Sequence, residues 1–192
     1  LTLVRADLLD NWQRMTPVDA PNRFVINMQP DQRAGVEALF ASEGLPGPAI
    51  EPMIRGRLLA INGEAVAPEA YADERTRRLA EREFNLSHSQ RLPGGNAVEA
   101  GRWHGEDRTP QFSVEQGLAQ TFGLKLGDRV RFDVAGREVE APITSVRRLD
   151  WDSMRVNFFF IASEGLLDDG SASLITSFHL PADSAAAIPE LV

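Results

Sequence analysis

The sequence predicts an α+β domain in which strands outnumber helices. Residues 129–134, RVRFDV, alternate charged and apolar side chains, which is the period of a strand with one buried face. Residues 156–162, VNFFFIA, are apolar on both faces and predict a strand in the middle of a sheet. Residues 113–122 repeat an apolar side chain every fourth position after Ser113 and Gln116, which have the spacing of a capping box and predict a helix.

The first third of the chain predicts the order helix, strand, helix, strand. Residues 1–15 carry an apolar stripe at helical spacing, and two prolines end that pattern. Residues 23–29 predict the first strand, and residues 31–43 a second helix that ends at a glycine. Residues 55–62 predict the next strand, and the Asn-Gly pair at its end is a strong signal for a hairpin turn.

The rest of the chain predicts a charged helix followed mostly by strands. Residues 71–83 pair Glu and Arg four positions apart and predict a solvated helix with a thin buried edge. Residues 84–90 predict a strand, and one further short strand is expected near Val98. Residues 129–147 predict a hairpin, whose return strand contains Pro142 and is therefore expected to lie partly at a sheet edge. Residues 173–180 predict the last strand, with a helix beginning after it.

Composition excludes several classes of function. A net charge of −8 and a pI near 4.9 argue against nucleic acid as a partner, because that binding needs clustered basic side chains. The chain has no cysteine, which excludes disulfides and thiolate chemistry. No run approaches the roughly 18 to 20 apolar residues of a membrane-spanning helix.

No set of residues forms a recognisable catalytic or metal site. The three histidines are far apart in sequence and lack ligand spacing. Asp150 and Asp152 flank Trp151 and could act as a pair of carboxylates, but the nearby arginines favour a local ion-pair network of Arg147, Arg148 and Arg155. His88 lies between two serines without the G-x-S-x-G context of a hydrolase. The sequence therefore predicts no enzyme activity, no cofactor and no metal.

Several segments resemble the extracytoplasmic domain of FtsX-like ABC transporter permeases of the MacB superfamily, most closely the YbbP-type branch. The resemblance covers nearly the whole chain. It is carried by residues 4–32, 55–63, 85–89, 100–103, 113–132 and 150–162, the last of which read DWDSMRVNFFFIA.

The resemblance implies a two-lobed, MacB-like periplasmic domain. Residues 1–21 would be a helix that continues from a transmembrane helix, and residues 22–62 and 173–192 would form a split β-α-β lobe that lacks its final strand. Residues 63–172 would be a β-rich lobe inserted between the two halves. The residues expected at a partner or lobe interface are Trp103, Trp151, Asp152, Met154 and Arg155.

The resemblance also implies a function without catalysis. The domain would lie in the periplasm, as part of a bacterial inner-membrane permease driven by a cytoplasmic ATPase. It would couple ATP hydrolysis to the handling of a lipid, a lipoprotein or a hydrophobic small molecule, by lobe movement or by partner docking. A periplasmic lysophospholipase, a thioesterase or a lipoprotein is the implied partner. The alternative from a different class is a free-standing periplasmic domain that binds or hydrolyses a ligand through the region of Asp150 and Asp152.

Overall fold

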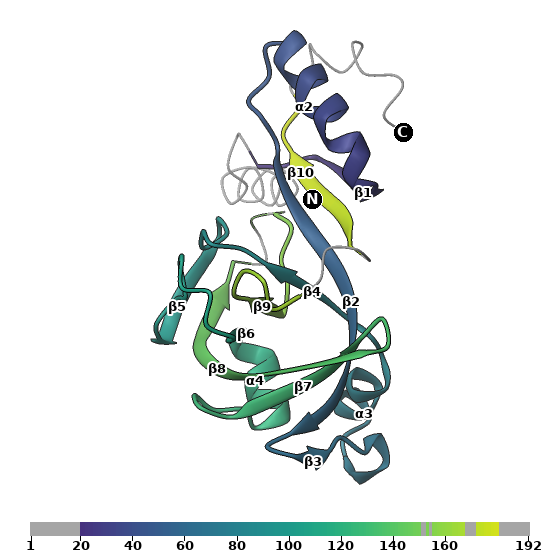
Figure 1. Cartoon of the computed structure of the whole chain (residues 1–192), viewed down its shortest axis with the longest axis vertical. Helices are drawn as coiled ribbons and strands as arrows, with labels where there is room; N and C mark the ends of the chain where they lie inside the picture. Colours follow the sequence, from purple (N-terminus) through teal and green to yellow (C-terminus); the bar gives the residue numbers. More distant parts are fainter. Residues whose placement is uncertain (1–19, 151–152, 154, 168–171, 181–192) are drawn as a thin grey trace, which may run out of the picture.

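The computed structural model describes residues 20–150, 153, 155–167 and 172–180, and strands dominate this part of the chain (Figure 1). Its strands are β1 (Arg23–Met28), β2 (Ala49–Ile61), β3 (Glu64–Ala65), β4 (Phe84–His88), β5 (Asn96–Gly101), β6 (Phe112–Glu115), β7 (Arg129–Val134), β8 (Arg137–Leu149), β9 (Phe160–Ala162) and β10 (Ser173–Phe178). Its α-helices are α2 (Arg33–Ser42), α3 (Glu74–Glu81) and α4 (Gln116–Phe122), with short 3₁₀ turns η1 (Pro30–Gln32) and η2 (Pro68–Ala70). Many strands with few helices agree with the predicted α+β class.

The upper part of Figure 1 is a small antiparallel sheet covered on one face by α2. Strand β10 lies in its middle and pairs with β1 on one side and with β2 on the other. The register places Arg23 opposite Phe178, so the sheet joins two segments that lie far apart in the sequence. A separate hydrophobic core lies between this sheet and the helix and consists of Met28, Val36, Phe40, Ile50 and Leu174.

Strand β2 runs from this sheet into the lower part of the molecule. Residues 49–53 pair with β10, residues 54–56 pair with β4, and residues 57–61 pair with β7. The same strand is therefore shared by the upper sheet and by the strands below it (Figure 1). The lobe boundary between residues 62 and 63 stays a prediction, and the shared strand already enters the lower part before that point.

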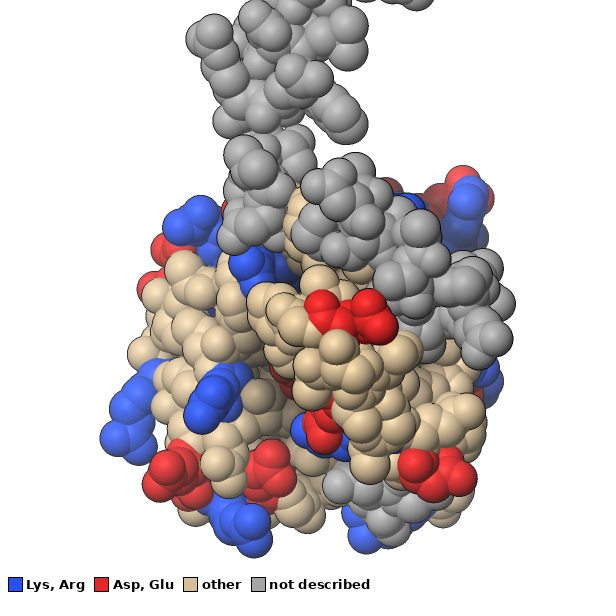
Figure 2. Space-filling model, turned by 90° about the horizontal axis from the view of Figure 1, so that it is seen from above, with Lys and Arg blue, Asp and Glu red and all other residues tan. Residues whose placement is uncertain are grey.

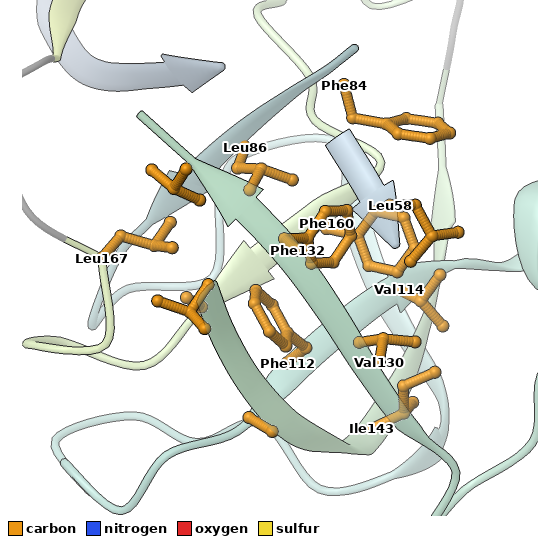
Figure 3. Packing of buried hydrophobic residues seen from close by; sticks show 14 of the residues in the cluster. Leu58, Phe84, Leu86, Phe112, Val114, Val130, Phe132, Ile143, Phe160 and Leu167 are labelled. Atoms are coloured by element: carbon orange, nitrogen blue, oxygen red, sulfur yellow. The ribbon is translucent and has the colours of Figure 1, made fainter. Parts of the chain in front are cut away.

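The lower strands close on themselves. Pairing runs from β2 through β4, β9, β6, β8 and β7 and returns to β2, with parallel contacts at β4–β9 and β6–β8. Figure 3 shows that the enclosed space is filled by side chains from these strands. Phe132 and Phe160 pack at a centroid distance of 5.0 Å, and Phe112 and Phe132 at 5.4 Å. A small closed sheet of this kind has a packed interior and no channel.

The two predicted hairpin turns are confirmed. Asn62 and Gly63 both have positive φ, of 53° and 82°, and they connect β2 to β3. Ala135 and Gly136 have φ of 52° and 83° and connect β7 to β8, as two-residue hairpin turns require. Among the described strands, Pro142 has a neighbour on one side only. It pairs with Arg129 of β7, and β8 pairs with β6 only from Ile143 onward, so the predicted edge position of Pro142 is also confirmed.

The predicted capping box at Ser113 is wrong. Ser113 lies fully buried in β6, and α4 begins only at Gln116. Glu115 is the N-cap instead, because its carboxylate accepts hydrogen bonds from the backbone N–H groups of Gly117 and Leu118, both at 2.7 Å. Residues 112–115 pair with strands on both sides as β6, so the burial of Ser113 in the closed sheet outweighed the capping pattern of the sequence. In the described part of the chain, none of the helices is long and apolar enough to cross a membrane.

Candidate functional site

A cleft of about 580 Å³ lies where the upper sheet meets the closed sheet. One side comes from η1, the start of α2 and the first residues of β2, which include Arg33 and Glu51. The other side comes from the end of β4 and the loop after it, from His88 to Arg91, together with Glu164 after β9. Because β2 passes beneath it, the cleft is built from both cores.

The cleft gathers charged side chains of both signs. His88 Nδ1 lies 3.2 Å from Glu164 Oε1, and the two side chains are only 11% and 28% exposed. Burial raises the pKa of Glu51, and the nearby charges of His88 and Arg33 offset only part of that effect. Desolvation disfavours the ionised carboxylate, so Glu51 is sensitive to any movement that opens the cleft to water.

The serines beside His88 are engaged in structural hydrogen bonds. Ser87 is buried, and its Oγ donates to Pro52 O at 2.7 Å, which ties β4 to β2. Ser89 Oγ donates to Arg91 O at 2.8 Å and shapes the loop after β4. Among the described residues, no three His, Cys, Asp or Glu side chains are grouped so that they could hold a metal ion. The cleft therefore combines a contact within one wall, between His88 and Glu164, with an electrostatic influence of His88 on Glu51 in the opposite wall, and its described residues assemble no nucleophile.

Two of the residues predicted at an interface contact the loop that borders this cleft. Trp103 Nε1 donates to Gln90 O at 2.8 Å, and its ring stacks on His104 at 4.0 Å. The Arg155 side chain lies against Gly94 at the other end of the loop. It is so close that a side chain at position 94 would have its Cβ 3.2 Å from Nη1 of Arg155. Trp151, Asp152 and Met154 lie outside the described residues, so their role stays a prediction.

Arg147, which the sequence predicted to join a local ion-pair network, is instead a buried structural residue. It is fully buried in β8, and burial lowers its pKa to about 10. Its guanidinium donates to Ser113 Oγ at 2.9 Å, to Asn96 Oδ1, and to the carbonyl oxygens of Phe158 and Phe159 at 2.9 and 3.2 Å.

Arg147 therefore does not belong to the predicted local network with Arg148 and Arg155. By contrast, the pKa of Arg148 is raised by its hydrogen bond to Glu99 and by the nearby charge of Asp150. Arg148 points outward and pairs with Glu99 at 2.7 Å, while Arg147 points inward. The signal was present in the sequence, because Ile143, Ser145, Arg147 and Leu149 follow one another at the two-residue period of one strand face.

The other two histidines have packing roles. His104 is buried, and its Nε2 lies 2.7 Å from Ser89 O, while burial lowers its pKa. His179 Nδ1 lies 2.8 Å from Ala20 O and joins the end of β10 to the start of the described chain. Figure 2 shows acidic and basic side chains interspersed on the upper face, so the described residues create no continuous field of one sign there.

Comparison with known proteins identifies a relative. The chain is 38% identical over 179 residues to the ABC transporter permease YbbP of Escherichia coli, a protein described as uncharacterized. The match covers 93% of this chain but only 21% of that relative, so the chain spans about a fifth of its length. No protein-family model matches the chain.

Among solved structures, a domain assigned to a permease protein from Porphyromonas gingivalis is similar in part. It is 13% identical, with a TM-score of 0.42, and the match covers 87% of this chain and 69% of that domain. The relationship to permeases therefore rests on the sequence identity to YbbP alone. The chain is thus a permease-related domain, homologous to one segment of an ABC transporter permease of the YbbP type, which confirms the resemblance predicted from the sequence.

Proposed function

We propose that this chain is the extracytoplasmic domain of an ABC transporter permease and that it works by relative movement of two lobes. The observation that supports this proposal is the cleft between two separate hydrophobic cores. Across the cleft, His88 lies close enough to Glu51 for its charge to offset part of the rise in pKa that burial causes in that carboxyl, while β2 continues through both parts. Ionic contacts across a cleft can break and re-form at low cost, whereas a shared apolar core would resist separation.

The proposed lobes are those expected from the resemblance: residues 22–62 with 173–192, and residues 63–172 inserted between them. Residues 54–61 of β2 pair and pack with the closed sheet, so this part of the first lobe would stay with that sheet during the movement. A cytoplasmic ATPase would drive the movement through the remainder of the permease, and the domain would lie in the periplasm of the bacterial inner membrane. The handled substrate would be a lipid, a lipoprotein or a hydrophobic small molecule. A secreted lysophospholipase, a thioesterase or a lipoprotein would act as the periplasmic partner, with Trp103 and Arg155 holding the loop beside the cleft.

A disulfide between the upper sheet and the segment before β9 tests the movement. Val156 precedes β9 and Ser177 lies in β10, and the backbone N–H of Val156 donates to Ser177 Oγ at 3.3 Å. Cysteines at these two positions, Val156→Cys and Ser177→Cys, would join the two parts with a short bridge. This chain has no native cysteine, so no thiol of its own competes.

Oxidation of the double variant in the full-length permease should stop the transport cycle, and reduction should restore it. The reporter is ATP turnover by the reconstituted transporter, and circular dichroism of the isolated chain checks that the fold persists. Each single cysteine variant serves as a control, since it cannot form the bridge. Equal turnover in the oxidised and reduced double variant would show that lobe movement is not the mechanism.

A further inference from the structure

We propose that the groove between α3 and α4 is a docking site for an acidic segment of a partner protein that inserts one large apolar side chain. This surface lies on the closed sheet, away from the cleft described above (Figure 1). Two adjoining hollows form it, of about 550 and 700 Å³, and both are lined by Arg75, Leu79 and Phe159.

The floor of the groove is a short apolar patch. Leu79 and Phe159 are half-buried and pack against the core, and Leu118 closes the floor from α4. The neighbouring lining residues Gln120 and Thr121 are polar and exposed. An acyl chain would need a long apolar trough, whereas one Leu or Phe side chain needs only a patch of this length. The lining therefore favours a peptide anchor over a lipid tail.

The rim of the groove carries more guanidinium groups than carboxylates. Arg75, Arg78 and Arg82 line it, and all three are exposed. Arg78 pairs with Glu74 within α3, but among the described residues neither Arg75 nor Arg82 has a carboxylate partner within salt-bridge distance. Arg82 instead lies over the ring of Phe84, with its guanidinium carbon 5.9 Å from the ring centroid.

Both carboxylates that line the groove, Glu74 and Glu115, are already engaged, and Glu74 pairs with Arg78. The carboxylate of Glu115 accepts two backbone N–H groups at the start of α4 and lies close enough to Arg147 to affect its charge. The positive charge available to an incoming partner is therefore that of Arg82 and of Arg75, the latter partly offset by the nearby carboxylate of Asp73. Guanidinium groups can bind carboxylates through two parallel hydrogen bonds. Arginine and the large aromatic residues are enriched among the hot spots of protein interfaces.

Photo-cross-linking in the full-length permease tests the proposal. A benzoylphenylalanine placed at Gln120, which is exposed in the groove, should capture a partner in cells of the native host. Mass spectrometry should identify the captured peptide as one with carboxylates flanking a large apolar side chain. Arg75→Glu combined with Arg82→Glu should reduce the yield by about tenfold or more, because the charge match is lost.

Arg108→Glu is the matched control, since Arg108 is an exposed arginine outside the groove and its substitution should leave the yield unchanged. Far-UV circular dichroism of the charge-reversed chain excludes unfolding as the cause of a lower yield. A second variant, Gln120→Trp, fills the groove without changing its charge. With the cross-linker moved to Thr121, this variant should no longer capture the partner. Capture of a basic peptide or a lipid, or a yield that does not depend on Arg75 and Arg82, would overturn the proposal. The cysteine lock between the two parts does not involve this groove, so either proposal can fail alone.

Discussion

Burial has different consequences for the charges of Glu51 and Arg147 in this protein. The guanidinium of Arg147 is fully buried but has four acceptors around it, and its pKa of about 10 keeps it charged at neutral pH. Glu51 lies in the cleft, where burial is the largest influence on its carboxylate and raises its pKa. Arg147 is therefore a structural charge, and Glu51 is a charge whose cost depends on how far the cleft is open.

Glu51→Gln should stabilise the chain at neutral pH. A carboxyl group whose folded pKa lies above its ordinary value of 4.5 binds more protons when folded, so stability falls as pH rises through the window between these two values. Glutamine removes that penalty. Urea unfolding across a pH series should show the variant to be more stable near pH 7, with the gain disappearing as pH falls toward 4.5. A gain that is independent of pH, or a loss at neutral pH, would contradict this explanation.

At the level of elements, one side chain from β8 holds the segment that leads into β9. Residues 155–158 form no helix or strand, yet the carbonyl groups of Phe158 and Phe159 are fixed by Arg147. The same guanidinium reaches Ser113 in β6 and Asn96 in β5. Three strands and one irregular segment therefore depend on a single buried side chain.

Arg147→Met should lower the free energy of unfolding by roughly 3 kcal/mol or more, because several buried acceptors lose their donor. Arg148→Met is the matched control: the neighbouring arginine is exposed and pairs with Glu99 on the surface, so its loss should change stability little. Chemical denaturation of both variants measures the difference. Similar stabilities for the two variants would mean that Arg147 does not hold these segments together.

The whole molecule consists of two hydrophobic cores of unequal size connected by β2. Among the described residues, the core of the closed sheet has nineteen buried members and that of the upper sheet has five. Of the strands in the part of the chain that the structure describes, only β2 belongs to both sheets, and its two halves have different neighbours. Regions with few buried apolar contacts open at a lower free energy, so the two parts are expected to open separately.

Phe40→Ala should loosen the upper sheet alone. Phe40 is 1% exposed and packs edge-on against Phe178 at 4.7 Å, and removing a buried ring of this kind typically costs about 3 to 5 kcal/mol. Hydrogen–deuterium exchange should accelerate in β1, α2, β10 and residues 49–53. Exchange in β6, β8 and residues 57–61 should stay slow. Uniform acceleration throughout the chain would indicate that the two cores unfold as one unit.

Local patterns in the sequence determined most of the elements. Alternation predicted β7 and β8, the Asn62-Gly63 and Ala135-Gly136 pairs predicted both turns, and the resemblance to permeases was confirmed. The strands and turns depend on residues that are close together in the chain, so a single sequence contains the information, whereas the resemblance depends on several segments spread along it.

The resemblance had placed β1 and β10 in one lobe, but tertiary structure alone decided their register, the closure of the lower sheet and the cleft between the cores. It also buried Ser113 in a strand where a helix cap was expected, and it supplied the acceptors that surround Arg147, whose side of the strand the local period already indicated. The pairing partner of a strand depends on which apolar faces are buried together over long separations. That choice is made by the packing of the whole chain, and no local period of side chains contains it.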